Sequence, residues 1–442
     1  MNNSMNRRNF IRTSALGSAA LGLAPATIRA FASGAPSDAI RVAVMGVNSR
    51  GGGLANSFAQ QHNTSIRYIC DVDARATRKV SRDVERMQDE MVEGMPDFRR
   101  ALEDPDVDVL VIAAPDHWHA PATILALQAG KHVYVEKPCG HNPREGELLV
   151  AAQERYGGLV QMGTQQRSGP ATIEAIQIIH DGGIGRPYFA RAWYANTRGS
   201  IGRGKVASIP RWLDYELWQG PAPRTPYRDN VVHYNWHWFW HWGTGEVCNN
   251  GTHEIDVARW ALGVDFPVRV NSSGGRYHFD DDWEFYDTQD VSYDFEEGKT
   301  ITWEGRSCNG FPVLDRGRGT LVHGTEGTIL MDRNGYVIYD EENAVVKEVK
   351  EKEMESTMDT TGGGGQTDRH IANFLEAIRE GRPLHTPIDE GHKSVLLCHL
   401  ANIAQKVGQT LHCDPGNGHI TGNPEAMELW ARDYEPGWEP TV

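Results

Sequence analysis

Two spacings of hydrophobic residues divide the chain into two regions. Between about residues 38 and 160, short apolar runs alternate with helical stretches, as in a doubly wound parallel sheet. The run at 107–113 is apolar without interruption, which is typical of a strand covered on both faces. This pattern predicts an α/β Rossmann domain at 38–160. Its other strands are expected at 40–46, 66–70, 132–135 and 159–163, and its helices at 51–59, 120–129 and 145–156.

Beyond residue 160 the pattern changes to alternating apolar and polar positions separated by glycine-containing turns. It predicts an α+β domain at 161–442 with a large, mostly antiparallel open sheet and helices on one side. A mobile loop is expected at the glycine run 360–365. The expected helices are 171–180, 368–379 and 392–407, and the expected strands are 188–194, 268–272, 288–293, 300–303, 319–323, 328–331 and 337–339.

The first 32 residues differ from both domains. The pair Arg7-Arg8 precedes a modest apolar stretch, and Ala30-Phe31-Ala32 is a small-x-small site. This order predicts a twin-arginine signal peptide at 1–32, and hence a periplasmic or otherwise exported protein. A disordered basic N-terminus is the alternative. The stretch is too short, and too rich in small residues, to span a membrane, and no other segment qualifies.

The composition argues against two classes of binding partner. A formal net charge of −15 argues against nucleic acid and against anionic membrane surfaces, because both repel an acidic protein. The thirteen tryptophans suit either core packing or a pocket in which a sugar stacks on a ring. The six cysteines contain no CxxC pair, and proteins exported by this route fold in the reducing cytoplasm. We therefore expect free, buried thiols and no metal site.

A glycine-containing loop follows the first predicted strand. It has the pattern G-x-N-x-x-G, in which Gly46 allows a tight turn and Gly51 allows close packing of strand on helix. Asn48 replaces the glycine that lets the backbone approach a diphosphate, and asparagine tolerates unusual φ better than most residues. The loop predicts a dinucleotide site. The residues expected to contact the cofactor are Gly46, Asn48, Ser49, Arg50 and Gly51.

Asp71 supports this interpretation, because it ends the second predicted strand about 20 residues later. A carboxylate there accepts hydrogen bonds from the ribose hydroxyls and disfavours a 2′-phosphate, which favours NAD over NADP. Arg75 and Arg78 leave NADP as the alternative. A Rossmann sheet without a nucleotide is the third interpretation.

Two more loops leave the carboxyl ends of predicted strands, where ligands of such sheets bind. The first is 114–119, from which we expect Pro115, His117 and His119 to contact the cofactor. The second is Glu136-Lys137-Pro138. Burial and a cationic nicotinamide would lower the pKa of Lys137, which could then bind the substrate oxygen and pass its proton.

The chain resembles the Gfo/Idh/MocA oxidoreductase family over nearly all of residues 33–442. The motifs that carry the resemblance are the loop 46–51, Asp71, 115–119, 136–138 and Gly251-Thr252-His253-Glu254-Ile255-Asp256, in that order. The segments 161–167, 218–223 and 370–375 resemble its twin-arginine-exported branch, which is similar to glucose–fructose oxidoreductases and inositol dehydrogenases. The resemblance also implies that Glu136 and Gln165 contact the cofactor.

The resemblance implies Lys137 and His253 as the catalytic pair. Many members carry an aspartate four residues before the histidine, whereas this chain has Asn249. At that spacing Asn249 would orient the imidazole without sharing its proton, and Asp256 is an alternative carboxylate for the same purpose. Asp256 as a structural residue is equally open.

An aromatic run precedes this motif, from Tyr234 to Gly243. Its density suggests one wall of a sugar pocket, with Tyr234 and Trp236 as substrate contacts, and packing between domains is the alternative. His237 and His241 have metal-ligand spacing, but nothing else in the sequence calls for a metal. Arg167 follows a strand and would bind either substrate or a neighbouring carboxylate.

Together these features predict an NAD(P)-dependent oxidoreductase that interconverts a hydroxyl and a ketone on a sugar, glycoside or cyclitol. We expect tightly bound NAD, a small carbohydrate substrate and a homodimer or homotetramer. The first alternative is an NAD-dependent glycoside hydrolase, in which oxidation and elimination precede water addition. The second is a non-catalytic binding or scaffold protein.

Overall fold

The computed structural model describes residues 39–351 and 365–442. The predicted signal peptide lies outside these residues, as does most of the predicted glycine loop. None of the helices described in these two ranges is long and apolar enough to cross a membrane.

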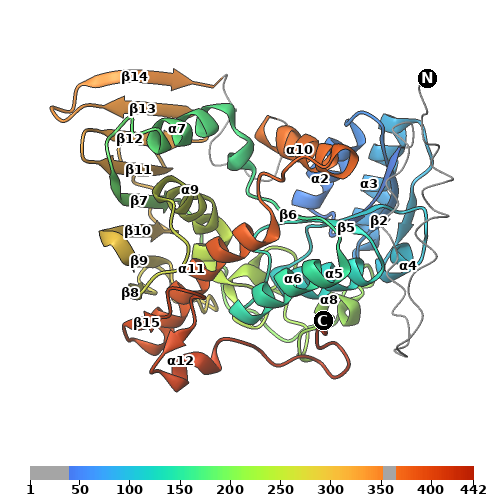
Figure 1. Ribbon diagram of the computed structural model, residues 1–442. Coiled ribbons are helices and arrows are strands. Elements are labelled where there is room, and N and C mark those ends of the chain that lie inside the picture. Colours follow the sequence, from blue (N-terminus) through green and yellow to red (C-terminus); the bar gives the residue numbers. More distant parts are fainter. Residues whose placement is uncertain (1–38, 352–364) are drawn as a thin grey trace, which may run out of the picture. The chain divides into compact units, whose positions relative to one another are not determined.

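The first sheet is parallel throughout and has the strand order β3-β2-β1-β4-β5-β6. This order confirms the predicted Rossmann fold, and the direction of winding reverses between β1 and β4. Its strands β2, β5 and β6 are labelled in Figure 1. Every residue of β4 is buried, as its uninterrupted apolar sequence predicts. The strands are β1 Ile40–Met45, β2 Thr64–Cys70, β3 Glu93–Met95, β4 Val109–Ile112, β5 His132–Val135 and β6 Val160–Met162.

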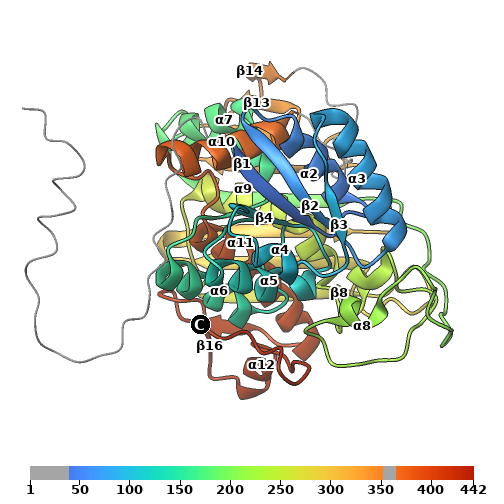
Figure 2. The ribbon, with the colours of Figure 1, turned by 90° about the vertical axis from the view of Figure 1, so that its right-hand side faces the viewer.

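Helices cover both faces of this sheet. Helices α2 and α3 pack together on one face, beside β1 and β2 (Figure 2), and α5 and α6 pack together on the other. Helix α5 begins at Asp116, so residues 116–119, expected in a loop, are helical. Pro115 is its N-cap, and an aspartate in the first turn favours a helix start. The helices are α2 Arg50–Ala59, α3 Ala74–Gln88, α4 Arg99–Leu102, α5 Asp116–Gln128 and α6 Pro143–Tyr156.

The second sheet has ten strands in the order β14-β13-β12-β11-β7-β10-β9-β8-β15-β16. Its pairs are antiparallel except β7 with β10, which confirms a mostly antiparallel sheet. Three strands were not predicted, because β14 is exposed and charged while β15 and β16 are very short. The strands are β7 Pro187–Ala195, β8 Arg269–Gly275, β9 Thr288–Phe295, β10 Lys299–Arg306, β11 Arg318–Gly324, β12 Thr328–Asp332, β13 Gly335–Tyr339, β14 Val345–Lys350, β15 Leu411–Cys413 and β16 Ile420–Thr421.

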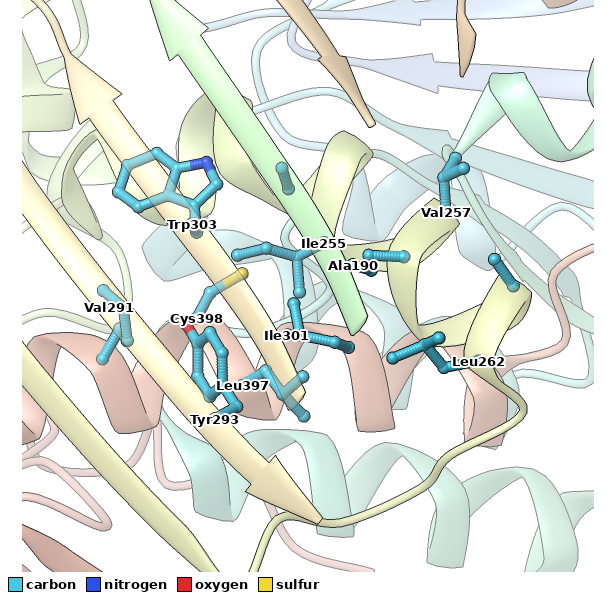
Figure 3. Close-up of a cluster of buried hydrophobic side chains, with 14 of the residues drawn as sticks. Ala190, Ile255, Val257, Leu262, Val291, Tyr293, Ile301, Trp303, Leu397 and Cys398 are labelled. Carbon is cyan, nitrogen blue, oxygen red and sulfur yellow. The ribbon is translucent and has the colours of Figure 1, made fainter. Parts of the chain in front are cut away.

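Three helices pack on one face of this sheet: α7 (Pro170–His180), α9 (Thr252–Leu262) and α11 (Ile388–Val407). Between them lies the largest apolar cluster, in which Trp303 and Ile301 of β10 meet Ile255 of α9 and Leu397 of α11 (Figure 3). The short helices α8 and α12 are Tyr215–Gln219 and Pro424–Glu428. The π-helical turn Val247–Gly251 leads directly into α9.

Helix α10 (Gln366–Glu380) belongs to the core of the Rossmann sheet rather than to the second sheet. Its Ile371 and Phe374 are buried in the same cluster as Val44 of β1 and Phe58 of α2. Strand β6 also runs to Met162, two residues beyond the expected boundary of the first domain. The predicted division at 160/161 is therefore too simple, because a distant apolar helix face completes the first core.

The six cysteines all lie within the described ranges, and each is free and buried, as predicted. Burial raises the pKa of the Cys139 and Cys413 thiols to about 12. These two thiols therefore stay protonated and weakly reactive at neutral pH.

Candidate functional site

A cleft opens at the carboxyl ends of the parallel strands, next to the point where the winding reverses. It contains about 1260 Å³ of empty space, including its open mouth. The Rossmann loops form one wall, and residues between 217 and 253 of the second domain form the other.

Most residues expected at the site line this cleft. They are Gly46, Asn48, Ser49, Arg50, Asp71, Pro115, His119, Glu136, Lys137, Gln165, Tyr234, Trp236, Asn249 and His253. Four others, Gly51, His117, Arg167 and Asp256, do not.

The loop between β1 and α2 can cradle a diphosphate. Gly46 has φ +81°, and a Cβ there would lie 2.5 Å from the backbone nitrogen of Ala114. Asn48 and Ser49 are exposed and line the cleft ahead of the first turn of α2. Backbone N–H groups at a helix N-terminus attract an anion. Gly51 is buried inside α2, where a Cβ would lie 1.9 Å from the Gly46 carbonyl oxygen, so its role is packing and not cofactor contact.

Asp71 lies at the end of β2, where a ribose would bind. Its Oδ2 accepts the Val47 N–H at 2.6 Å and its Oδ1 accepts the Asp73 N–H at 2.8 Å. Burial raises the pKa of this carboxyl, against these two hydrogen bonds. Each carboxylate oxygen keeps a further lone pair for a ribose hydroxyl. Arg75, the alternative signal for NADP, is bound by Asp73 at 2.8 Å and lies over the Trp212 ring.

Replacing Asp71 with alanine is expected to weaken NAD binding by roughly tenfold to a hundredfold, because hydrogen bonds to a charged group contribute about 1.5–3 kcal/mol. Isothermal titration with NAD and NADP measures this, with the exposed Asp106→Ala as control. An Asp71→Ala variant that binds NAD as tightly as the parent would remove Asp71 from the ribose site.

Lys137 reaches the cleft from the loop after β5. Its Nζ donates to the Asn249 carbonyl at 2.6 Å and to Asn249 Oδ1 at 3.2 Å. Burial lowers the pKa of Lys137, while the carboxylates of Glu136 and Asp116 oppose that shift. An ammonium has three N–H groups, so one remains for a ligand in the cleft.

Glu136 ties this loop to the cofactor loop. Its Oε1 accepts from Arg50 Nε at 2.8 Å and from Gln165 Nε2 at 2.9 Å. Although burial opposes it, the charges of Arg50 and Lys137 hold the pKa of Glu136 below its ordinary value. Glu136 therefore remains ionised, and three residues expected at the cofactor site form one network.

His253 lies on the first turn of α9 and is only 2% exposed. Neither of its ring nitrogens has a hydrogen-bond partner among the described residues. Burial, followed by the charges of Arg333 and Lys137, holds its pKa well below the usual range. The ring is therefore neutral at pH 7, with one donor and one acceptor. Buried polar groups without partners are rare, so a ligand in the cleft fits here.

The predicted contact between Asn249 and His253 is wrong. Residues 247–251 form a π-helical turn, which disrupts the i, i+4 geometry of an α-helix. Asn249 instead accepts from Lys137 through Oδ1 and donates to Glu246 through Nδ2 at 3.2 Å.

Some rings of the aromatic run line the cleft, and others pack against buried residues. Tyr234, Trp236 and His237 line the cleft, with the last two rings stacked at 3.6 Å between centroids. Trp238 instead stacks on the buried Trp283. His237 and His241 each lie against a backbone carbonyl. Within residues 39–351 and 365–442, no three potential ligands gather as a metal would require.

His117 was expected to contact the cofactor, and the structure corrects this. It lies in the first turn of α5, fully buried, with Nε2 2.9 Å from the Trp218 carbonyl and Nδ1 3.3 Å from that of Trp242. His117 therefore joins the two domains. His119 does line the cleft, but its ring nitrogens lie against the carbonyls of Ala114 and Pro138.

Buried histidines predict a specific pH dependence of stability. Burial lowers the pKa of His117 and His399 to about 3, whereas an unfolded histidine titrates near 6.5. Below pH 6.5 the unfolded chain takes up protons that the folded state excludes. Each residue then lowers the free energy of unfolding by up to about 1.4 kcal/mol per pH unit. Urea unfolding at pH 7.5, 6.5 and 5.5 should show a small fall between the first two values and a larger one between the last two. Equal stability at 6.5 and 5.5 would contradict it.

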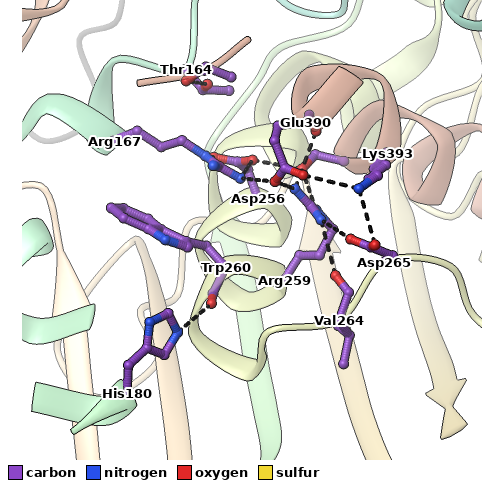
Figure 4. A network of polar contacts seen from close by, with 12 residues as sticks. Thr164, Arg167, His180, Asp256, Arg259, Trp260, Val264, Asp265, Glu390 and Lys393 are labelled. Carbon is purple, nitrogen blue, oxygen red and sulfur yellow. Dashed lines mark hydrogen bonds and ion pairs between the residues drawn. The ribbon is translucent and has the colours of Figure 1, made fainter. Parts of the chain in front are cut away.

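Arg167 was expected to bind either the substrate or a neighbouring carboxylate, and Asp256 either to serve the site or to be structural. The two form a buried ion pair outside the cleft, so the structural alternative holds for both (Figure 4). The guanidinium binds both carboxylate oxygens at 2.8 Å, and Ser394 donates to the same carboxylate at 2.6 Å. Glu390, which also pairs with Arg259, lies 3.6 Å from Arg167. Asp256 thus accepts three hydrogen bonds from Arg167 and Ser394, and neither ring nitrogen of His253 is bonded to it.

Glu246 and His233 are among the residues at the site that were not predicted. Glu246 lies three residues before Asn249, a spacing that could have suggested a contact. His233 lines the cleft and its Nε2 lies 2.9 Å from Asp73, which follows β2. No sequence signal joins residues that far apart.

The chain matches known proteins in both halves. Residues 40–164 match the family model described as oxidoreductase family, NAD-binding Rossmann fold. A glycosyl hydrolase family 109 protein of Saccharopolyspora erythraea is 29% identical over 230 residues, which are 48% of this chain and 50% of that protein. Levoglucosan dehydrogenase of Pseudarthrobacter phenanthrenivorans is 35% identical over 168 residues, 38% of this chain and 36% of that one. The chain thus spans half or less of these relatives.

Solved structures share the fold over most of the chain. Levoglucosan dehydrogenase in complex with NADH and levoglucosan has a TM-score of 0.65 at 19% identity, covering 85% of this chain and 99% of that one. Aldose–aldose oxidoreductase of Caulobacter crescentus has a TM-score of 0.64 at 19% identity, with the same coverage. At this identity the likeness shows the fold alone.

Residues 192–439, more than half of the chain, match the second model, which is described as oxidoreductase family, C-terminal alpha/beta domain. Both models are those of Gfo/Idh/MocA proteins, and they follow one another in the chain without overlap. The protein therefore belongs to the Gfo/Idh/MocA oxidoreductase family and carries its NAD-binding Rossmann domain.

Proposed function

We propose that this protein interconverts a hydroxyl and a ketone on a sugar, glycoside or cyclitol by hydride transfer with NAD. The observation that carries the proposal is the convergence of Lys137 and His253, from different domains, on the cleft that contains the dinucleotide loop. The relative named as levoglucosan dehydrogenase, 35% identical over 168 residues, supports a carbohydrate as substrate. The exposed, cleft-lining Tyr234 provides an aromatic surface on which a sugar could stack.

Bound NAD would accept or return the hydride of the carbon that is oxidised or reduced. The residues of this chain handle the proton. Lys137 offers one free N–H to the substrate oxygen, and its lowered pKa favours proton transfer. His253 is neutral and has no hydrogen-bond partner in the described part of the chain, so one of its ring nitrogens can take the hydroxyl proton during oxidation and return it during reduction.

Two measurements test this proposal. Native mass spectrometry of the full chain should find bound NAD, the form that Asp71 favours. A panel of sugars, glycosides and cyclitols should then give a keto product together with stoichiometric NADH. A cleft that binds NAD but changes the redox state of no carbohydrate would reject the proposed substrate class.

A glycoside hydrolase remains the second candidate because several relatives are named glycosyl hydrolase family 109 proteins. In that reaction oxidation, elimination, water addition and re-reduction leave NAD unchanged overall. Glycosides incubated with the enzyme and no added acceptor distinguish the two. Released free sugar supports the hydrolase, and a keto-sugar that forms only with an acceptor supports the dehydrogenase.

We further propose that the protein is exported through the twin-arginine route, as the exported branch of the family would be, and works in the periplasm with its cofactor retained. The motif at Arg7-Arg8 supports this. Fusing residues 1–32 to a folded reporter tests it, because export should require the arginine pair. A homodimer or homotetramer is proposed as well, and light scattering of the purified chain measures it.

A further inference from the structure

The Asn249 side chain lies between a lysine and a glutamate. Its Oδ1 accepts from Lys137 Nζ at 3.2 Å, and its Nδ2 donates to Glu246 Oε1 at 3.2 Å. An amide has one accepting end and one donating end. The carboxylate of Glu246 can only accept, so it requires the NH₂ group on its own side and leaves the oxygen for Lys137.

Glu246 is itself held firmly. It is 3% exposed, and its Oε2 accepts from Arg198 Nε at 2.6 Å and from Ser307 Oγ at 3.1 Å. Although burial opposes it, the charge of Arg198 keeps the pKa of Glu246 below its usual value. The carboxylate therefore stays ionised and fixed in place.

The local backbone brings these groups together. Residues 247–251 form a π-helical turn, and such turns are often found at functional sites. The Asn249 carbonyl thereby accepts a second hydrogen bond from Lys137, at 2.6 Å. Two of the three ammonium N–H groups are thus directed at one residue, and that residue is oriented by Glu246.

We propose that Glu246 is a positioning residue for Lys137: through Asn249 it holds the ammonium so that the third N–H is directed into the cleft. The proposal rests on the proton-transfer role given to Lys137 above. It also assigns to Glu246 the carboxylate that many family members carry at position 249, one hydrogen bond further from the lysine.

The charges around Lys137 predict the direction in which its pKa changes when the Glu246 charge is removed. Glu136 and Asp116 raise its pKa, Arg50 lowers it, and Glu246 raises it. His237 and His253 also lie within its electrostatic reach, and both are neutral because burial lowers their pKa. Removing the Glu246 charge should therefore lower the pKa of Lys137.

Trace labelling of Lys137 with acetic anhydride over a pH series, with peptide mass spectrometry, tests the proposal without turnover. In Glu246→Gln the pH midpoint of labelling should fall by about one unit. In the double variant Glu246→Gln, Asn249→Asp the amide and the carboxylate are exchanged, and the midpoint should return to the parent value or above it. The double variant does not restore the charge opposite Arg198, so recovery would show that a carboxylate near Lys137, and not the pair of Glu246 with Arg198, sets the midpoint.

Glu147→Gln is the matched control, because Glu147 is also bound by an arginine but lies outside the cleft. Its labelling midpoint should equal that of the parent. If Glu246→Gln does not fold, Asn249→Leu still interrupts the relay and should lower the midpoint. An unchanged midpoint in a folded Glu246→Gln, or in Asn249→Leu, would overturn the proposal.

Turnover separates this proposal from the proposed function. With a substrate from the carbohydrate panel, kcat of Glu246→Gln should fall by roughly tenfold to a hundredfold with little change in KM, and the exchanged variant should regain most of it. Shifted midpoints without any carbohydrate turnover would leave Glu246 as the positioning residue and reject the sugar chemistry. Turnover with unshifted midpoints would reject the positioning role alone.

Discussion

Replacing Lys137 with methionine is expected to lower kcat/KM for the carbohydrate substrate by about 10²–10⁴-fold, the usual contribution of one general acid–base group. Methionine keeps the length and fills the partly buried space, but it has no N–H for the substrate oxygen and no proton to pass. Steady-state production of NADH measures the loss.

Two comparisons make this result specific. NAD binding by the Lys137→Met variant should stay close to that of the parent, because the diphosphate loop and Asp71 are untouched. Lys347→Met, at the exposed pair with Glu174, should retain full activity. Full activity in both Lys137→Met and His253→Ala would reject the proposed chemistry and leave a binding or scaffold role.

Replacing Asp256 with alanine is expected to lower the free energy of unfolding by about 3–5 kcal/mol, because the buried Arg167 loses the carboxylate that accepts two of its hydrogen bonds and keeps only Glu390 at 3.6 Å. Arg167 is 5% exposed, and burial opposes its charge while Asp256 supports it. Urea unfolding of the variant and its parent measures this loss. The exposed Glu174→Ala should cost less than about 1 kcal/mol.

A double variant distinguishes an effect on the stability of the fold from an effect on substrate binding. Arg167→Met with Asp256→Leu removes both charges and should be far less destabilised than Asp256→Ala alone, since well-packed apolar residues often replace a buried ion pair at little cost. Its KM should match that of the parent, because neither residue lines the cleft. A raised KM in a stable double variant would return Arg167 to the substrate site.

Regular hydrophobic patterns predicted most of the fold. The strand 132–135 was placed to the residue, and the parallel sheet followed from buried runs such as β4. Charged α3 and exposed β14 escaped prediction, because a surface element needs few apolar positions. Helix α10 was predicted as a helix, but not as part of the Rossmann core. The sequence of a helix shows that it has an apolar face, but not which distant segment that face packs against.

The candidate site was likewise predictable only in part from the sequence. Loops that leave the ends of parallel strands must meet at one edge, so Gly46, Asp71 and Lys137 could be brought together from sequence. The orientation of single side chains could not. His117 contacts backbone carbonyls, and Arg167 binds a carboxylate 89 residues further along the chain.

The sequence by itself therefore determined the two sheets, the dinucleotide loop and Lys137 at the cleft, because strand periodicity and strand-end loops are local properties. His253, on helix α9, was identified only through the resemblance to the family. Only the tertiary structure decided which partner each polar group takes. Because residues 247–251 form a π-helical turn, Asn249 contacts Lys137 and not His253, and Glu246 accepts a hydrogen bond from Asn249. Such choices depend on which donors and acceptors are buried together, and burial is settled by packing between distant segments.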